Sequence, residues 1–173
     1  MFEKIRKMKN QKGFTLVELI VVLVILAILA AMLVPALTGY IDKANNEKII
    51  AATRQVVMAA QTEVSEAYAS KTLKETTITI TNTNAPSYSV EANTEVAGEK
   101  IVKLAEVATV GTDNTCTFKN SISKIEITYT ADGHVSKVVL TQGKNVCTYA
   151  ETEAGKPTGT IKYTSGNYYV TAA

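Results

Sequence analysis

The chain has 173 residues, with 18 basic and 16 acidic side chains, and 46% of its residues are hydrophobic. That balance fits one folded domain rather than a disordered chain or a protein with many membrane spans. One His and two Cys offer little material for a metal cluster or for a nucleophile with its base, so we expect neither a cofactor nor an enzymatic activity.

The basic charge is concentrated at the N-terminus. Residues 1–13 contain five Lys or Arg and one Glu, a net charge of +4, so the remainder carries −2 of the overall +2. Lys and Arg in front of an apolar run stay on the cytoplasmic side of a membrane. The rest of the chain has no bulk attraction for nucleic acid, and we expect no nucleic-acid partner.

An apolar run follows the basic tail. Leu19–Val34 is sixteen consecutive apolar residues, and no charge occurs from Leu19 through Ile41. With its flanks, the run is long enough to cross a hydrocarbon core of ~30 Å as a helix, with the N-terminus inside. Two ordinary interpretations are a plain single-span anchor and a secretory signal peptide cleaved near Ala31.

Glu18 argues against both interpretations. A carboxylate inside a spanning helix costs ~2.5–3.5 kcal/mol at the helix centre and less near an end, where it can snorkel to the interface. Nothing in a disposable signal peptide requires it. The residues around it resemble the prepilin processing site of type IV pilins and their pseudopilin relatives: Lys12-Gly13-Phe14-Thr15-Leu16-Val17-Glu18-Leu19.

The resemblance covers residues 1 to about 70 and implies specific roles. A membrane-embedded prepilin peptidase would cut after Gly13 and methylate the amino group of Phe14. Glu18 would match the glutamate that sets the register of subunits during assembly, and Pro35 a proline that interrupts the helix. The other implied partners are copies of the chain itself, a pilus assembly ATPase and an inner-membrane platform protein. The precursor would lie in the cytoplasmic membrane and the mature subunit in a surface filament.

Electrostatics supports this role for Glu18. Cleavage after Gly13 leaves a cationic amine on Phe14, four residues before Glu18, and both charges need a counter-charge in an apolar setting. Within one subunit the pair would be strained near the frayed first turn. Glu18 of an incoming chain could instead neutralise the amine of its predecessor, which would give axial register.

Beyond Pro35 the helix is predicted to continue to about Ser70 with an amphipathic pattern. Apolar residues recur at intervals of three or four, and polar residues fill the other faces. The apolar set is Ile49, Ala52, Val56, Ala60, Val64 and Ala67, and the polar set is Glu47, Lys48, Arg54, Gln61, Glu63 and Glu66.

We expect three parts: a leader of residues 1–13, a long helix of residues 14–70 and a globular antiparallel β domain of residues 71–173. Residues 14–37 would serve as membrane anchor and later as filament core, and residues 38–70 would pack on the sheet. The predicted fold class is therefore α+β, in the lollipop form that the resemblance implies.

Short antiparallel strands are predicted in the outer domain. They are Thr76–Thr81, Ile125–Thr130, Val135–Thr141, Val146–Tyr149, Gly159–Thr164 and Asn167–Thr171. Asp132-Gly133 is typical of a two-residue hairpin turn. The resulting register pairs Tyr129 with Ser136, Ile127 with Val138, Ile125 with Leu140, Thr128 with Lys137 and Glu126 with Val139. Residues 71–115 are the least readable, with an amphipathic stretch at residues 99–108.

The two cysteines flank this hairpin. If its ladder continued outward, Phe118 would oppose Cys147 and Cys116 would be the diagonal neighbour, so a small offset could bring the thiols into bonding range. The region is predicted to be extracytoplasmic, where disulfides persist. We therefore predict a Cys116–Cys147 disulfide, and the alternative is two free thiols. The sequence has no C-x-x-C motif, so it does not suggest a zinc or thioredoxin-like site.

The sequence thus predicts a structural subunit of a type IV pilus-like filament that serves adhesion, motility or aggregation, with a host or abiotic surface as a further partner. A pseudopilin of a type II secretion or competence machine shares every N-terminal feature. The mature length of 160 residues and the Thr-rich outer domain favour the pilus. An alternative of another class is a secreted binding domain behind a conventional signal peptide.

Overall fold

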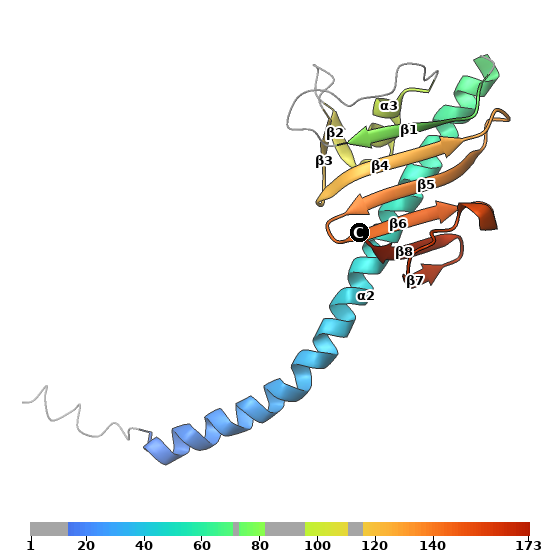
Figure 1. Cartoon of the computed structure of the whole chain (residues 1–173). Coiled ribbons are helices and arrows are strands. Elements are labelled where there is room, and N and C mark those ends of the chain that lie inside the picture. Colours follow the sequence, from blue (N-terminus) through green and yellow to red (C-terminus); the bar gives the residue numbers. More distant parts are fainter. Residues whose placement is uncertain (1–13, 71–72, 82–95, 111–115) are drawn as a thin grey trace, which may run out of the picture. The chain divides into compact units, whose positions relative to one another are not determined.

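The computed structural model describes the chain in four segments, which are residues 14–70, 73–81, 96–110 and 116–173. A long helix, α2 (Leu16–Ser70), is followed by an antiparallel sheet of six strands, so the predicted α+β class is confirmed (Figure 1). The chain divides into two compact units, with the boundary between Lys43 and Ala44.

The first unit is helical and apolar in its described part. Every side chain from Phe14 to Lys43 is exposed. Within the described residues, α2 is the one helix long and apolar enough to cross a membrane, judged by length and composition. A helix that is apolar on all sides has no face suited to water, so this stretch requires lipid or other apolar surfaces around it.

The helix continues through Pro35. Proline has no N–H, so the carbonyl of Ala31 loses its helical hydrogen bond there. The hydroxyl of Thr38 donates to the carbonyl of Pro35 at 2.8 Å, which is a local side-chain contact one turn further on. The predicted interruption is thus limited to one missing hydrogen bond and does not end the helix, because the turns on both sides keep their own bonds.

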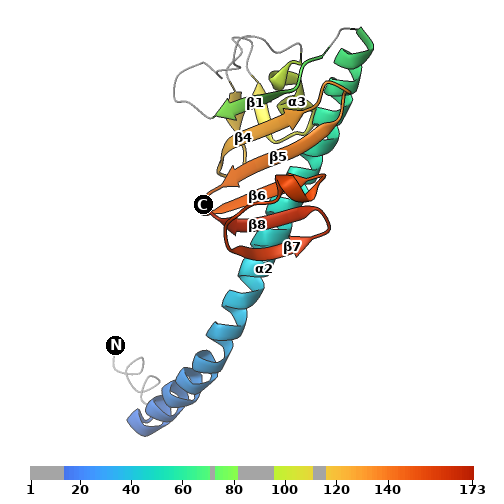
Figure 2. The same ribbon diagram turned by 45° about the vertical axis from the view of Figure 1, so that its right-hand side comes forward.

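The second unit contains a six-stranded sheet in the order β1-β4-β5-β6-β8-β7, with every neighbouring pair antiparallel (Figures 1 and 2). The strands are β1 Thr76–Thr81, β4 Ile122–Tyr129, β5 Val135–Gln142, β6 Asn145–Ala150, β7 Ile161–Ser165 and β8 Tyr168–Ala172. All six predicted strands are confirmed, with ends displaced by a few residues.

The core of this unit lies between the sheet and the part of α2 that follows Ala44. The helix buries Ile49, Ile50, Thr53, Val56, Ala59, Ala60, Val64 and Ala67. Alternate strand residues face them, including Ile78, Ile80, Ile125, Ile127, Val138, Leu140, Cys147 and Val170. Burying one such large aliphatic side chain stabilises the fold by ~1.5–3 kcal/mol. The predicted apolar helix face is confirmed, except that Ala52 is only half-buried.

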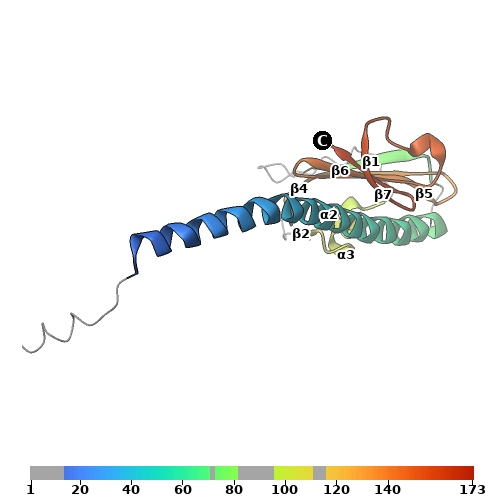
Figure 3. The ribbon, with the colours of Figure 1, turned by 90° about the horizontal axis from the view of Figure 1, so that it is seen from below.

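A short helix and a small sheet complete the helix side of the unit. They are α3 (Gly98–Leu104), β2 (Ala108–Val110) and β3 (Cys116–Phe118), with β2 and β3 paired antiparallel. They lie on the same side of the large sheet as α2 (Figure 3). A Cβ at Gly98 would lie 3.1 Å from Cδ1 of Ile80 on β1, so the α3 N-terminus packs directly on this sheet.

The β4–β5 hairpin keeps most of the predicted register. Four of the five predicted pairs are present, but Tyr129 pairs with Val135 instead of Ser136 because a bulge follows Thr128. The turn is also longer than predicted: Gly133, at φ +80°, donates its N–H to the carbonyl of Thr130, and Thr130 donates to the carbonyl of His134. A type I turn closed by a glycine in the left-handed region produces this bulged hairpin.

The predicted disulfide is not formed, because Cys147 is a free and fully buried thiol. The register behind that prediction is wrong. Cys116 pairs with Val110 in the small sheet, whereas Cys147 lies between Leu140 of β5 and Val170 of β8 in the large sheet. The chain leaves the ladder at the Asn120–Ser121 turn, where both residues have positive φ, so β3 and β6 belong to different sheets.

Candidate processing and assembly site

The start of α2 is capped by its own residues. Thr15 precedes the first helical residue, and its Oγ1 accepts a hydrogen bond from the N–H of Glu18 at 3.2 Å. The same hydroxyl lies 3.5 Å from Oε2 of Glu18, to which it donates. This Thr-x-x-Glu arrangement is related to a capping box, which satisfies N–H groups that a helix leaves unpaired at its start.

The capping residue was not singled out from the sequence, although the signal is present as Thr15 followed by Glu18 three positions later. The Thr15 cap affects the carboxylate of Glu18. An acidic side chain in the first helical turn interacts favourably with the helix dipole, so both this position and the cap suit a glutamate at residue 18. The cap therefore places the Glu18 carboxyl group at the N-terminal end of the apolar stretch.

Glu18 has no cationic partner in the described part of its own unit before Lys43. No Lys or Arg occurs between Phe14 and Asp42, and Lys43 is 25 positions away, ~37 Å along a straight helix. Its neighbours Leu16, Val17 and Leu19 are all exposed and apolar. An unpaired carboxylate is energetically costly in apolar surroundings, so a positive charge from outside the helix would stabilise it.

The other predicted residues are placed as follows. Phe14 is 83% exposed and lies immediately before the cap, so the position of the predicted new N-terminus is accessible. Gly13 lies outside the described residues. Pro35 lies further along the same helix, and the two cysteines belong to the other unit.

Comparison with known families bears on this stretch. Residues 8–34 match the family model described as the prokaryotic N-terminal methylation motif. The matched stretch is a methylation motif of the class III leader type. This match supports the type IV pilin or pseudopilin class, whose motif implies processing by a prepilin peptidase. A search of curated proteins and of solved structures finds no match.

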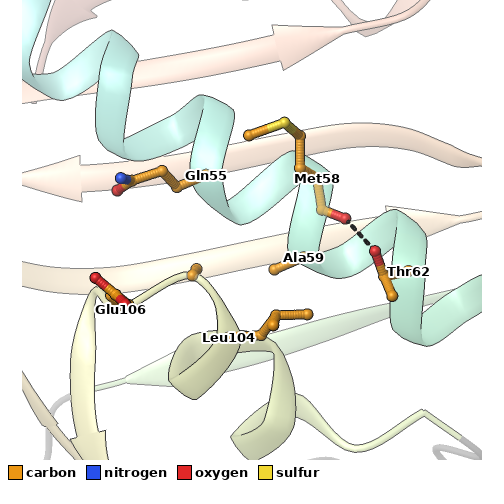
Figure 4. Close-up of a pocket in the computed structure, with 7 residues that line it drawn as sticks. Gln55, Met58, Ala59, Thr62, Leu104 and Glu106 are labelled. Carbon is orange, nitrogen blue, oxygen red and sulfur yellow. Dashed lines mark hydrogen bonds between the residues drawn. The ribbon is translucent and has the colours of Figure 1, made fainter.

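A shallow depression of about 240 Å³ lies between α2 and the end of α3 (Figure 4). It is lined by Gln55, Met58, Ala59, Thr62, Leu104, Ala105 and Glu106. The Thr62 hydroxyl already donates to the carbonyl of Met58 at 2.9 Å, and the described residues contain no group of three potential metal ligands. Glu106 is the one ionisable side chain among these seven lining residues.

The buried thiol of Cys147 is also chemically quiet. Burial raises its pKa from 9.0 to about 11, and this effect outweighs the opposing influence of the Thr53 hydroxyl and the Arg54 charge. The thiolate is the nucleophile and the metal ligand, so a thiol with this pKa is inert at neutral pH. Cys147 is a core residue.

Alkaline solution should destabilise the second unit (Ala44–Ala173), which we call the globular unit, through ionisation of this thiol. Its folded pKa is raised, so its stabilising contribution is complete below about pH 9 and is lost as the pH rises to about 11. Cys147→Ala should show a smaller drop in thermal midpoint between about pH 8 and about pH 10.5 than the unchanged chain. Equal drops in the two proteins would contradict this assignment.

Proposed function

We propose that the chain is the structural subunit of a type IV pilus-like surface filament, assembled by packing of its N-terminal apolar helices. The observation that carries this proposal is the exposed, uncharged stretch from Leu19 to Ile41, which begins inside the methylation motif of residues 8–34 and extends beyond it. The apolar surface of this stretch can be covered first by lipid and later by the helices of identical subunits. The same segment would then serve as membrane anchor and as filament core.

Processing prepares the end of this helix. A prepilin peptidase removes residues 1–13 after Gly13 and methylates the new amino group on Phe14. The amine is positive and lies one residue before the Thr15 cap, while Glu18 is negative and lacks a cation in the described part of its unit. Pairing Glu18 of one subunit with the amine of another satisfies both charges and fixes the axial position of the incoming subunit.

The chain itself performs no catalysis in this scheme. Peptidase, assembly ATPase and inner-membrane platform protein supply the chemistry and the energy, and the chain supplies repeated contacts. Before assembly it resides in the cytoplasmic membrane with its basic N-terminus inside. After assembly its globular unit faces the outside, where it contacts a host or abiotic surface.

Fractionation of cells that express the chain tests this proposal. The unchanged chain should appear in the filament fraction sheared from the cell surface, whereas Gly13→Leu should remain in the membrane fraction with its leader attached. A glycine before the cut leaves the peptidase space that a leucine side chain would fill.

The alternatives predict different distributions. A pseudopilin would stay with the membrane fraction in both cases, without its leader in the unchanged chain and with its leader in Gly13→Leu. A secreted binding domain would be soluble and indifferent to Gly13→Leu. Either distribution would overturn the assignment as a pilus subunit.

A further inference from the structure

Four side chains of α2 recur at intervals of seven residues: Glu47, Arg54, Gln61 and Tyr68. Seven residues are nearly two helical turns, so all four lie along one flank of the helix. The polar members of this row look solvent-facing in the sequence. In the structure each of the four contacts a strand of the sheet or the β4–β5 turn, and we call the four residues the clasp row.

The first two members hold the β7–β8 hairpin. The hydroxyl of Tyr163 donates to Oε1 of Glu47, and this bond raises the pKa of the tyrosine. Nη2 of Arg54 donates to Oγ of Ser165 at 3.2 Å, and its guanidinium lies 5.1 Å from the ring centroid of Tyr168. These contacts join residues more than a hundred positions apart in the chain.

The last two members hold the turn of the β4–β5 hairpin. The side-chain amide of Gln61 donates to the carbonyl of Gly133 at 2.8 Å and accepts from the N–H of Val135 at 2.9 Å. The ring of Tyr68 lies over the same glycine, since a Cβ at Gly133 would come within 2.9 Å of Tyr68 Cγ. Gln61 thus forms hydrogen bonds with the backbone of Gly133 and Val135 as a neighbouring strand would, and the Tyr68 ring covers the turn.

Apolar packing and hydrogen bonds both limit where the helix sits along the sheet. A shift by four residues would keep apolar residues at the sheet positions of Val56 and Ala60, but it would bring Arg54 to the buried position of Ile50. Hydrogen bonds have strict distances and angles, so such a shift would break the clasp row at Arg54 and Gln61 together. Polar contacts of this kind add a directional restraint to the apolar packing.

We propose that the clasp row fixes the axial position of α2 on the sheet and determines the residue at which the packed part of the helix begins. Its first contact, at Glu47, lies just after the boundary between the two units at Lys43. The proposal concerns the globular unit alone and does not depend on filament formation.

Hydrogen exchange of the full-length chain in detergent micelles, followed by mass spectrometry, tests the clasp. In the double variant Arg54→Ala/Gln61→Ala, the amides of residues 44–54 should exchange at least about tenfold faster than in the unchanged chain. The exchange rates of amides in β4, β5 and β6 should stay the same. The matched control is Lys48→Ala/Gln55→Ala, which removes the same types of side chain from exposed positions of the same helix. It should leave exchange unaltered.

A milder variant separates a local clasp from general stability. Tyr163→Phe removes one hydroxyl and should accelerate exchange only near residues 44–50, by a few-fold. The proposal is overturned if neither variant changes exchange in the helix. It is equally overturned if exchange rises uniformly through helix and strands, or if the control variant has the same effect.

Discussion

Glu18→Ala should lower the yield of sheared filaments by at least about tenfold while the leader is still removed. Under the proposed pairing, loss of the carboxylate would leave the amine of the neighbouring subunit unpaired in an apolar environment. Removing one partner of such a pair costs ~3–5 kcal/mol, which exceeds a tenfold change in an equilibrium. Processing should persist because residues 12–14 around the cut are unchanged. Filament yield is measured by immunoblotting of the sheared fraction, and leader removal by the mobility of the cellular protein.

Two variants at the same position separate charge from shape. Glu18→Gln keeps the size of the side chain and should fail like Glu18→Ala, whereas Glu18→Asp keeps the charge and should retain part of the yield. Normal filament yield from Glu18→Gln would contradict the charge-pairing role. Loss of leader removal in all three variants would place Glu18 in recognition by the peptidase instead.

Gly133→Ala should destabilise the globular unit by ~2–4 kcal/mol. The residue has φ +80°, where an L side chain costs ~1–2 kcal/mol, and the new methyl group would lie 2.9 Å from Cγ of Tyr68. Either the Tyr68 ring moves off the turn or the hairpin shifts away from the helix. Urea unfolding of the full-length chain in detergent, followed by near-ultraviolet circular dichroism, measures the loss.

Gly143→Ala is the matched control for this prediction. That glycine also has positive φ, at +55°, but a Cβ there would meet nothing within 4 Å. It should therefore show only the backbone contribution, ~1–2 kcal/mol. Equal losses for the two variants would show that the contact between Tyr68 and the turn contributes nothing.

Local patterns in the sequence account for most of the fold. Alternating Thr and Ile define β1 with the predicted bounds, and Asp132-Gly133 places the β4–β5 hairpin with its main pairs. The three- and four-residue spacing from Ile49 to Ala67 identifies the helix face that packs on the sheet. In each case the signal and the structure lie within one short segment, so no long-range information is needed.

The errors arise where distant segments meet. The disulfide prediction extended one hairpin ladder through Phe118, but β3 leaves that ladder and pairs with β2. The pairing of β6 with β8 cannot be derived from either strand alone. Likewise, Arg54 and Gln61 look solvent-facing in a helical pattern, and only the folded chain brings Ser165 and Gly133 to them.

The processing site shows the opposite situation. Gly13, Phe14 and Glu18 are predicted from residue order alone, and all three lie within residues 8–34, which match the N-terminal methylation motif. Their roles stay predictions. The Thr15 cap was not predicted, although Thr15 and Glu18 have the three-residue spacing of a capping box. The Thr15 cap adds a structural reason for an acidic side chain at position 18.

The most direct test of the account is the intact mass of the chain recovered from filaments sheared from intact cells. We predict a species of 160 residues that begins at Phe14 and carries one additional methyl group on its amino terminus. A soluble species in the medium that begins near Ala31, with no chain in the filaments, would contradict the account.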